Sequence, residues 1–326
     1  MRRPDHHRRT AHVNEVLTVP SFAKINWILK ILGKRPDGYH EVSTLLQTID
    51  LRDQIHVFPR RNEGIQIEVE GRPVPSGEGN LLYRAAALFG RRAGIDLGVC
   101  VRLHKRIPVG AGLGGGSGNA AVLLLCLNQI WNGPLDKRHL AEIGADIGAD
   151  VAFFLSGGTA LGEGRGERIT PLPDPPPEKL LLIFPGLHIT SKEAYAAGGW
   201  GNLPPQRDLR LTKRKVDTKI QRFREKIESG RSVRGCAEND FEVPILKRYP
   251  LLAEIKKSLG RAGCERVILC GSGSSILGLG EPRRVVEVAD SISRQGLGEV
   301  FLCRSLSRSH YRNILRQSGL HLSDFR

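Results

Sequence analysis

The sequence predicts an α+β protein in two domains, and three observations support this prediction. The chain has 326 residues, a length that suits two domains of ordinary size. Strand-like and helix-like segments are intermixed along it, as in mixed α and β architectures. Pro171 to Pro177 holds five prolines in seven residues and cannot form a helix or a central strand. We therefore expect a stiff connection near a domain boundary there.

We expect three parts: a disordered basic tail at 1–14, an N-terminal domain at 15–175 and a C-terminal domain at 176–326. The tail is basic and His-rich, and no apolar segment follows it, which argues against a secretory signal. Hydrophobic residues make up 40% and charged residues 25% of the chain, as in packed globular proteins. Since no apolar run approaches the roughly 18 residues of a membrane span, we expect no membrane association.

In the first half of the chain, short alternating runs predict strands and longer apolar patterns predict helices. The turn residues Pro36-Asp37-Gly38 separate the first two strands. Asn80 is suited to cap the helix that follows it. The predicted strands are 25–32, 42–49, 54–58, 65–69 and 99–103, and the predicted helices are 80–92, 118–131 and 137–147.

The second half of the chain predicts a smaller α+β domain. Short elements are expected at 152–155 and 157–166, before the proline-rich connection, and at 180–184, after it. The predicted helices are 191–197, 215–229, 250–259 and 285–294, and the predicted strands are 266–269 and 275–279. The helix at 285–294 is expected to close the chain.

The net charge of +15, with a pI near 9.9, leaves two classes of partner open. A basic surface binds nucleic acid non-specifically, and it also steers phosphorylated ligands into a cleft. The chain has no interleaved aromatic and basic RNA-binding pattern, no zinc-ligand spacing and no clear helix-turn-helix. We therefore expect a small-molecule substrate and no nucleic acid.

The six cysteines, at 100, 126, 236, 264, 270 and 303, predict the compartment. They form no CxxC pair and have no histidine at metal-ligand spacing. We therefore expect the cysteines to be reduced thiols in a cytoplasmic protein. Cys126 and Cys270 have apolar sequence neighbours, so we expect these two to be buried.

A glycine-rich run indicates an anion site. Five glycines lie between 110 and 116, and a long apolar helix is predicted just after Ser117. Glycines let backbone N–H groups curl around a phosphate, and the helix N-terminus adds partial positive charge. Ser117 is suited to cap the helix, to donate to a phosphate or to help hold Mg²⁺. A flexible loop is the alternative, but the flanking strand and apolar helix argue against it.

Two familiar nucleotide-binding loops do not fit this run. A P-loop ends in Lys-Ser or Lys-Thr, which is missing here, and no acidic residue follows at the distance expected of a Rossmann fingerprint.

The run, together with Phe22-Ala23-Lys24-Ile25-Asn26 and Gly271-Ser272-Gly273-Ser274-Ser275, resembles the three motifs of the GHMP kinases in order and spacing. The resemblance implies a two-domain fold, with an N-terminal domain like the second domain of ribosomal protein S5 and a ferredoxin-like C-terminal domain. ATP would bind the N-terminal domain with Mg²⁺ as charge partner. The C-terminal domain would complete the substrate cleft.

The stretches 33–41, 148–151, 157–160 and 238–241 resemble the branch of this family that acts on diphosphocytidyl methylerythritol. That branch phosphorylates the 2-hydroxyl of its substrate in the methylerythritol phosphate pathway to isoprenoid precursors. Homoserine, mevalonate and galactose kinases are the rival members, but their substrates have no cytosine for Asp37-Gly38-Tyr39-His40 to bind. One departure is Gly118, where relatives carry a second serine, so we expect one hydroxyl fewer near the phosphates.

The resemblance assigns Asp150 as the base that accepts the hydroxyl proton and Lys24 as the cation beside it. Taken alone, Asp150 would more often be a helix N-cap or turn residue. Lys24 taken alone would be a surface lysine, although it interrupts an apolar run.

Tyr39 is expected to stack on the cytosine, His40 to pair with its edge, and Tyr195 to offer a second stacking face or to be a partly buried core residue. The expected ATP-binding residues are Pro108, Val109, Gly110, Ala111, Gly112, Leu113, Gly114, Gly115, Gly116, Ser117, Gly118 and Asn119. The expected substrate-binding residues are Asn26, Tyr39, His40, Thr159, Tyr195, Gly271, Ser272 and Gly273. Protein ligands of Mg²⁺ are not assigned, and we expect a monomer or weak homodimer.

Overall fold

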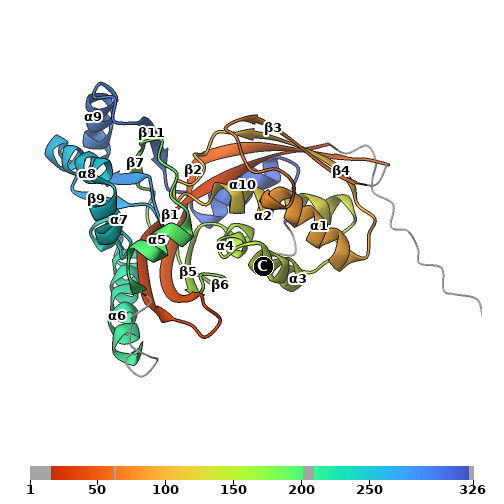
Figure 1. Cartoon of the computed structure of the whole chain (residues 1–326), viewed down its shortest axis with the longest axis horizontal. Helices are drawn as coiled ribbons and strands as arrows, with labels where there is room; N and C mark the ends of the chain where they lie inside the picture. Colours follow the sequence, from red (N-terminus) through yellow and green to blue (C-terminus); the bar gives the residue numbers. More distant parts are fainter. Residues whose placement is uncertain (1–15, 62–63, 201–208, 323–326) are drawn as a thin grey trace, which may run out of the picture.

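The computed structural model describes residues 16–61, 64–200 and 209–322. The expected tail at 1–14 lies outside these residues. The described chain forms two sheets, each with its own helices, which agrees with the predicted α+β class. In Figure 1 the smaller sheet lies at the left with its helices, and the larger sheet runs from β3 and β4 at the upper right to the end of β1 and β2 beside α5 and α6.

The larger sheet has seven strands, with β3-β4-β2-β1-β8 as its main path and β5 and β6 attached through β2. Four helices belong to this part of the chain, and the apolar α2 is buried on nearly all sides. The strands are β1 (Leu17–Lys34), β2 (His40–Pro59), β3 (Gly64–Gly71), β4 (Gly98–Lys105), β5 (Thr159–Gly164), β6 (Arg168–Pro171) and β8 (Glu238–Asn239). The helices are α1 (Leu81–Ala93), α2 (Gly115–Ile130), α3 (Lys137–Ile147) and α4 (Val151–Ser156).

The smaller sheet has four strands in the order β11-β7-β10-β9, all antiparallel. Its strands are β7 (Lys179–Phe184), β9 (Arg266–Leu269), β10 (Ile276–Leu279) and β11 (Glu299–Arg304). The remaining helices are α5 (Ser191–Ala197), α6 (Leu209–Glu228), α7 (Glu242–Arg248), α8 (Pro250–Ala262), α9 (Pro282–Ser293) and α10 (Arg308–Gln317).

Two of the predicted boundaries are wrong for identifiable reasons. The segments 42–49 and 54–58 are one strand, β2, because the register against β1 shifts between Ile49 and Arg52 while the pairing continues on both sides. Helix α2 begins at Gly115 rather than 118, with Gly114 as its N-cap in the left-handed conformation. Ser117 therefore lies inside the first turn and does not cap the helix.

The sequence led us to expect that the helix now seen as α9 would be the last element, and this prediction is wrong. Strand β11 joins the smaller sheet, and α10 returns to the core of the larger one. Tyr311 of α10 is 1% exposed, packs edge-on against Phe22 at 5.5 Å, and donates a 2.5 Å hydrogen bond to the carbonyl of Phe154. The division of the chain at residue 175 stays a prediction.

All six cysteines are free thiols. Cys126 and Cys270 are buried, as predicted, and burial raises the pKa of the Cys270 thiol to about 12. Within the described residues, no helix is both long and apolar enough to cross a membrane.

Candidate active site

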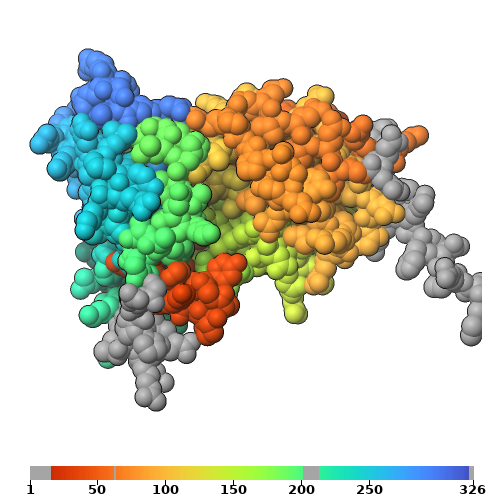
Figure 2. Space-filling model, viewed as in Figure 1, coloured from red at the N-terminus to blue at the C-terminus, as the bar shows by residue number. Residues whose placement is uncertain are grey.

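Two adjoining cavities lie in the cleft between the two groups of elements. One, of about 360 Å³, follows the glycine run, and the other, of about 760 Å³, reaches the turn between β1 and β2. Figure 2 shows the surface hollowed between the green segment around α5 and the orange N-terminal elements. The residues that line both cavities are Lys24, Ser117, Asp150, Ser191 and Ser272. The predicted catalytic pair therefore stands where the two cavities meet.

The two glycine-rich loops touch each other through their backbones. A Cβ placed on Gly112 would lie 1.9 Å from the carbonyl oxygen of Cys270, and one on Gly271 would lie 2.8 Å from the carbonyl oxygen of Gly112. Both glycines have positive φ, at 76° and 51°. The amide of Ser275 also donates to the carbonyl of Ala111 at 3.2 Å. Glycine is thus required at Gly112 and Gly271 both because the two backbones approach closely and because φ is positive.

Helix α2 presents its N-terminus to the smaller cavity. No side chain caps it, and the first helical bond runs from the amide of Gly118 to the carbonyl of Gly114. The amides of Gly115, Gly116 and Ser117 precede that bond, and such groups are the usual donors to a bound anion.

Gly118 corrects one expectation. It does not line either cavity; a Cβ there would lie 2.6 Å from the carbonyl oxygen of Phe22 and 3.1 Å from Oγ of Ser21. Position 118 faces β1, so its lack of a hydroxyl removes nothing from the cavity side of the loop. A serine at this position would need β1 to move.

Lys24 and Asp150 form a bridge across the junction. Nζ of Lys24 lies 3.4 Å from Oδ2 of Asp150 and donates to Oδ1 of Asn26 at 2.9 Å. Asn26 in turn donates to Thr44 at 2.7 Å, and the hydroxyl of Thr44 donates to the carbonyl of Ile28. The Lys24 side chain is 5% exposed, whereas that of Asp150 is 30% exposed. A buried ammonium thus has partners, and the carboxylate remains open to the cavity.

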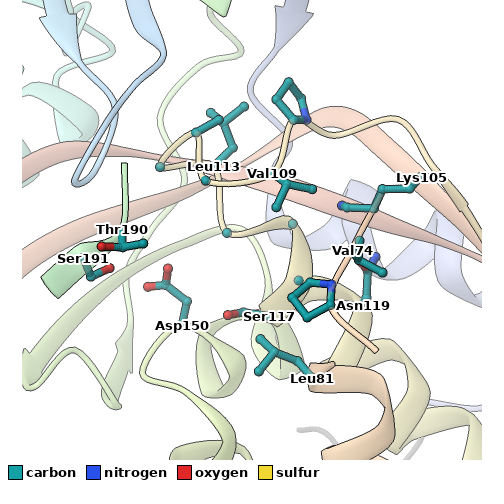
Figure 3. A pocket seen from close by; sticks show the side chains of 18 of the residues that line it. Val74, Leu81, Lys105, Val109, Leu113, Ser117, Asn119, Asp150, Thr190 and Ser191 are labelled. Atoms are coloured by element: carbon teal, nitrogen blue, oxygen red, sulfur yellow. The ribbon is translucent and has the colours of Figure 1, made fainter. Parts of the chain in front are cut away.

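Asp150 occupies the N-cap position of α4, but its side chain makes no capping hydrogen bond. Asp150 therefore has the position of an N-cap residue but not the hydrogen bond of one. Figure 3 shows its carboxylate beside Ser117 in the cavity, with Thr190 and Ser191 on the far side.

The larger cavity ends in aromatic and cationic side chains. Tyr39 is 56% exposed, and the guanidinium of Arg165 lies 4.9 Å from its ring centroid. His40 stacks on Tyr195, with 4.3 Å between centroids and 8° between planes. Burial, and to a lesser degree Lys34, lowers the pKa of His40, and its buried Nε2 finds no hydrogen-bond partner among the residues that the structure describes. Burial, with a smaller contribution from Asp150, raises the pKa of Tyr195 to about 12.

Most predicted site residues line the cleft, and three do not. The hydroxyl of Thr159 is fully buried and has two possible acceptors for its one hydrogen, Oε1 of Gln47 at 2.8 Å and Oδ1 of Asp174 at 2.9 Å, so it is satisfied internally. The Cβ position of Gly273 faces the apolar side chains of Leu269 and Ile189 at 3.3 and 3.4 Å. Gly118 faces β1, as described above. All three positions face the interior of the protein, and their assignment to ATP or substrate binding stays a prediction.

The sequence did not indicate several cavity-lining residues. The smaller cavity has an apolar end formed by Val74, Pro75, Leu81 and Leu103, with Lys105 beside it. Arg84, Arg165 and Lys192 line the larger cavity. The apolar residues come from three separate segments, so no local sequence pattern indicated that they line one cavity. Asn80, which also lines the cavity, was singled out only as a helix cap.

The donor set at the junction suits Mg²⁺ as a partner of phosphates. Within the described ranges, no cluster of three or more His, Cys, Asp or Glu side chains could hold a metal ion. Mg²⁺ commonly takes one or two protein oxygens and completes its shell with phosphates and water. Asp150 and Ser117 offer such oxygens in both cavities.

Comparison with known proteins places these features in a family. Residues 80–158 match the family described as GHMP kinases N terminal domain. A 4-diphosphocytidyl-2-C-methyl-D-erythritol kinase of Pelotomaculum thermopropionicum is 41% identical over 264 residues, covering 81% of this chain and 89% of the relative. The enzyme of the same name from a Geobacillus species is 38% identical over 294 residues, covering 90% and 98%.

Solved structures show the same fold. A crystal structure of 4-(cytidine 5'-diphospho)-2C-methyl-D-erythritol kinase superposes with a TM-score of 0.71 at 33% identity, covering 89% of this chain and 99% of that one. Homoserine kinase from Cytophaga hutchinsonii superposes with a TM-score of 0.67 at 20% identity, covering 89% and 95%. The second likeness bears on the fold alone.

Proposed function

This chain belongs to the GHMP kinases and, among them, to the 4-diphosphocytidyl-2-C-methyl-D-erythritol kinases, and from that premise we propose that it transfers the γ-phosphoryl group of ATP to the 2-hydroxyl of 4-diphosphocytidyl-2-C-methyl-D-erythritol. The reaction is a step of the methylerythritol phosphate pathway. The observation that carries the proposal is the pair of cavities that meet at Lys24 and Asp150. A two-substrate transfer needs such a junction.

ATP occupies the smaller cavity in this proposal. Its adenine fits the apolar end formed by Val74, Pro75 and Leu81, and its phosphates lie against the amides at the start of α2. The uncapped helix and the glycines that admit close approach support this placement.

Asp150 accepts the proton of the attacking hydroxyl, and Lys24 holds the carboxylate and stabilises charge on the transferred group. The phosphoryl group moves directly from ATP to the alcohol in line, without a covalent phosphoenzyme. The 3.4 Å bridge between the two side chains and the openness of Asp150 to both cavities support these roles.

The diphosphocytidyl group lies in the larger cavity. Tyr39 supplies a stacking face, and His40, which lines the same cavity and whose Nε2 has no hydrogen-bond partner among the described residues, pairs with the base edge. Asn26, Gly271 and Ser272 border the reacting alcohol. Tyr195, which stacks on His40, supports that ring and is not needed as a second face.

Mg²⁺ would be held by Ser117 and Asp150 together with the nucleotide phosphates. When bound, it neutralises charge on the phosphate oxygens. We further propose that 15–175 forms the ATP-binding domain, to which α10 returns, and that 176–326 completes the cleft in a cytoplasmic monomer or weak homodimer.

A panel of acceptor alcohols tests the function. The purified protein is incubated with ATP and, separately, the cytidyl substrate, homoserine, mevalonate or galactose, and ADP release is followed. We expect kcat/KM for the cytidyl substrate to exceed the others at least 100-fold, and phosphorus NMR to place the new phosphate on the 2-hydroxyl. Turnover of homoserine or mevalonate without turnover of the cytidyl substrate would contradict the assignment.

A further inference from the structure

A carboxylate that the proposed chemistry does not use lies buried beneath the glycine run. Asp53, on β2, is 1% exposed. Its Oδ1 accepts from the amides of Arg106 at 2.7 Å and Ile107 at 2.8 Å. Its Oδ2 accepts from Nζ of Lys105 and from Nδ2 of Asn119, the latter at 2.9 Å. Four donors thus converge on one carboxylate.

These donors bracket the glycine run in the sequence. Arg106 and Ile107 come directly before Pro108, where the run begins. Asn119 lies in α2 just after the run and also donates to Oγ of Ser21 on β1 at 3.0 Å. A single side chain therefore holds the strand that leads into the loop and the helix that leads out of it.

Lys105 connects this carboxylate to the cavity. Its side chain lines the cavity, and Figure 3 shows it pointing inward between Val109 and Asn119. A Cβ on Gly115 would lie 2.7 Å from its Nζ, so the ammonium is packed against the first residue of α2. Burial lowers the pKa of Lys105, and Asp53 opposes that effect. The carboxylate thus keeps a buried cation beside the proposed phosphate site.

We propose that Asp53 is a positioning residue for nucleotide binding, because it fixes both ends of the glycine run and holds Lys105 against the N-terminus of α2. The inference rests on the proposed placement of ATP in the smaller cavity. Asp53 touches neither substrate. Its loss should weaken the binding of ATP and leave the binding of the cytidyl substrate unchanged.

Asp53→Asn is the informative change because it preserves shape. Its carboxamide oxygen still accepts from the amides of Arg106 and Ile107, but its NH₂ group then faces two other donors, Lys105 and Asn119. We expect KM for ATP, and the dissociation constant for ATP measured by calorimetry without any alcohol, to rise at least tenfold. KM for the cytidyl substrate stays within twofold.

Asp174→Asn is a matched control. Asp174 also gathers three donors, from the amide and hydroxyl of Thr159 and the amide of Arg308, but it does not line either cavity. A loss of thermal stability in both variants with a rise in the ATP constants only in Asp53→Asn supports the inference. Unchanged ATP binding in folded Asp53→Asn, or an equal rise in both KM values, overturns it.

The calorimetry separates this inference from the function itself. If the wild-type protein fails to bind ATP, the proposed nucleotide site is refuted. If the wild type and Asp53→Asn bind ATP equally well, only the role of Asp53 is refuted. If Asp53→Asn does not fold, Asp53→Glu takes its place, since it keeps the negative charge beside Lys105 but displaces the carboxylate from the amides of Arg106 and Ile107 and from Asn119. We then expect at least a threefold weaker binding of ATP, and no change would overturn the inference.

Discussion

The two ends of the cleft, where we propose that ATP binds (the nucleotide end) and the diphosphocytidyl group binds (the cytidyl end), are built from different parts of the polypeptide. At the nucleotide end, backbone meets backbone: a Cβ on Gly112 would lie 1.9 Å from a carbonyl oxygen, and the charged groups beneath the loop are buried. At the cytidyl end, side chains make the contacts: Arg165 lies over the exposed Tyr39, and the partly buried rings of His40 and Tyr195 stack on each other. The first end leaves no room for a Cβ at Gly112 or Gly271, while the second depends on ring faces that substitutions alter by degrees.

Asp150→Asn tests the junction between the two ends and carries the largest expected effect. The carboxamide keeps the shape but cannot accept the hydroxyl proton, so we expect kcat to fall by roughly 10²- to 10⁴-fold. Binding of ATP and of the cytidyl substrate, measured separately by calorimetry, should remain detectable. Near-normal turnover would remove Asp150 from the role of base.

Gly112→Ala tests the nucleotide end. The φ of 76° and the 1.9 Å approach to the Cys270 carbonyl leave no place for a methyl group, so the backbone must shift. We expect a stability loss of roughly 1–3 kcal/mol from the strained backbone, and at least a tenfold rise in KM for ATP. Thermal denaturation and initial rates measure both.

Gly260→Ala is the control for that change. Gly260 lies in α8 with nothing within 4 Å of its Cβ position, so alanine there should leave both KM values unchanged and stabilise the helix by up to about 1 kcal/mol. A Gly112→Ala enzyme that matched this control would mean that the loops separate easily, and the contrast between the two ends would fail.

Tyr39→Ala tests the cytidyl end. Loss of a stacking face for the base should raise KM for the cytidyl substrate by roughly 5- to 150-fold and leave KM for ATP within twofold. Tyr39→Phe retains the ring and should behave like the wild type. An equal loss in both variants would point to the hydroxyl rather than to stacking.

His40 gives the smallest expected effect, because its ring is only partly buried. Its pKa is lowered in the folded protein, so the unfolded chain, with an ordinary value near 6.5, takes up the proton first. Stability from this group is therefore complete above pH 6.5 and declines as the pH falls below it. We expect the melting temperature of the wild type to drop more between pH 7.5 and 5.5 than that of His40→Asn. Parallel curves would show that the stacked ring titrates normally.

The loop that lines the nucleotide end could be predicted because its glycines form a recognisable pattern in the sequence. The five glycines of the run indicated an anion-binding loop before any contact was known, and the structure lines the cavity with the whole of 108–117. Most helices and strands followed from periodicity in the same way. Lys24 and Asp150 were brought together by a family resemblance, since no local pattern links residues so far apart in sequence.

The remaining features depend on long-range packing that local patterns do not report. Asp53 follows Leu51-Arg52 in what looks like an ordinary polar strand end, and its partners lie 52 to 66 positions away. Strand β8 has only two residues, too few for an alternation to appear. Helix α10 is rich in arginine and buries little more than Tyr311 and Leu315, so its apolar stripe is narrow. Thr159 was placed at the site through its motif, but its neighbours in space enclose it.

The return of α10 to the larger sheet bears on how the chain matures during synthesis. Tyr311 fills space beside Gly157, where a Cβ would lie 2.1 Å from its ring, and Leu315, Leu320 and Leu322 belong to the same core cluster as Phe22. The first strand of the sheet thus waits for residues made some 290 positions later. This core cannot close before these residues have been synthesised and have left the ribosome, so the cleft reaches its final form only after translation has passed residue 322.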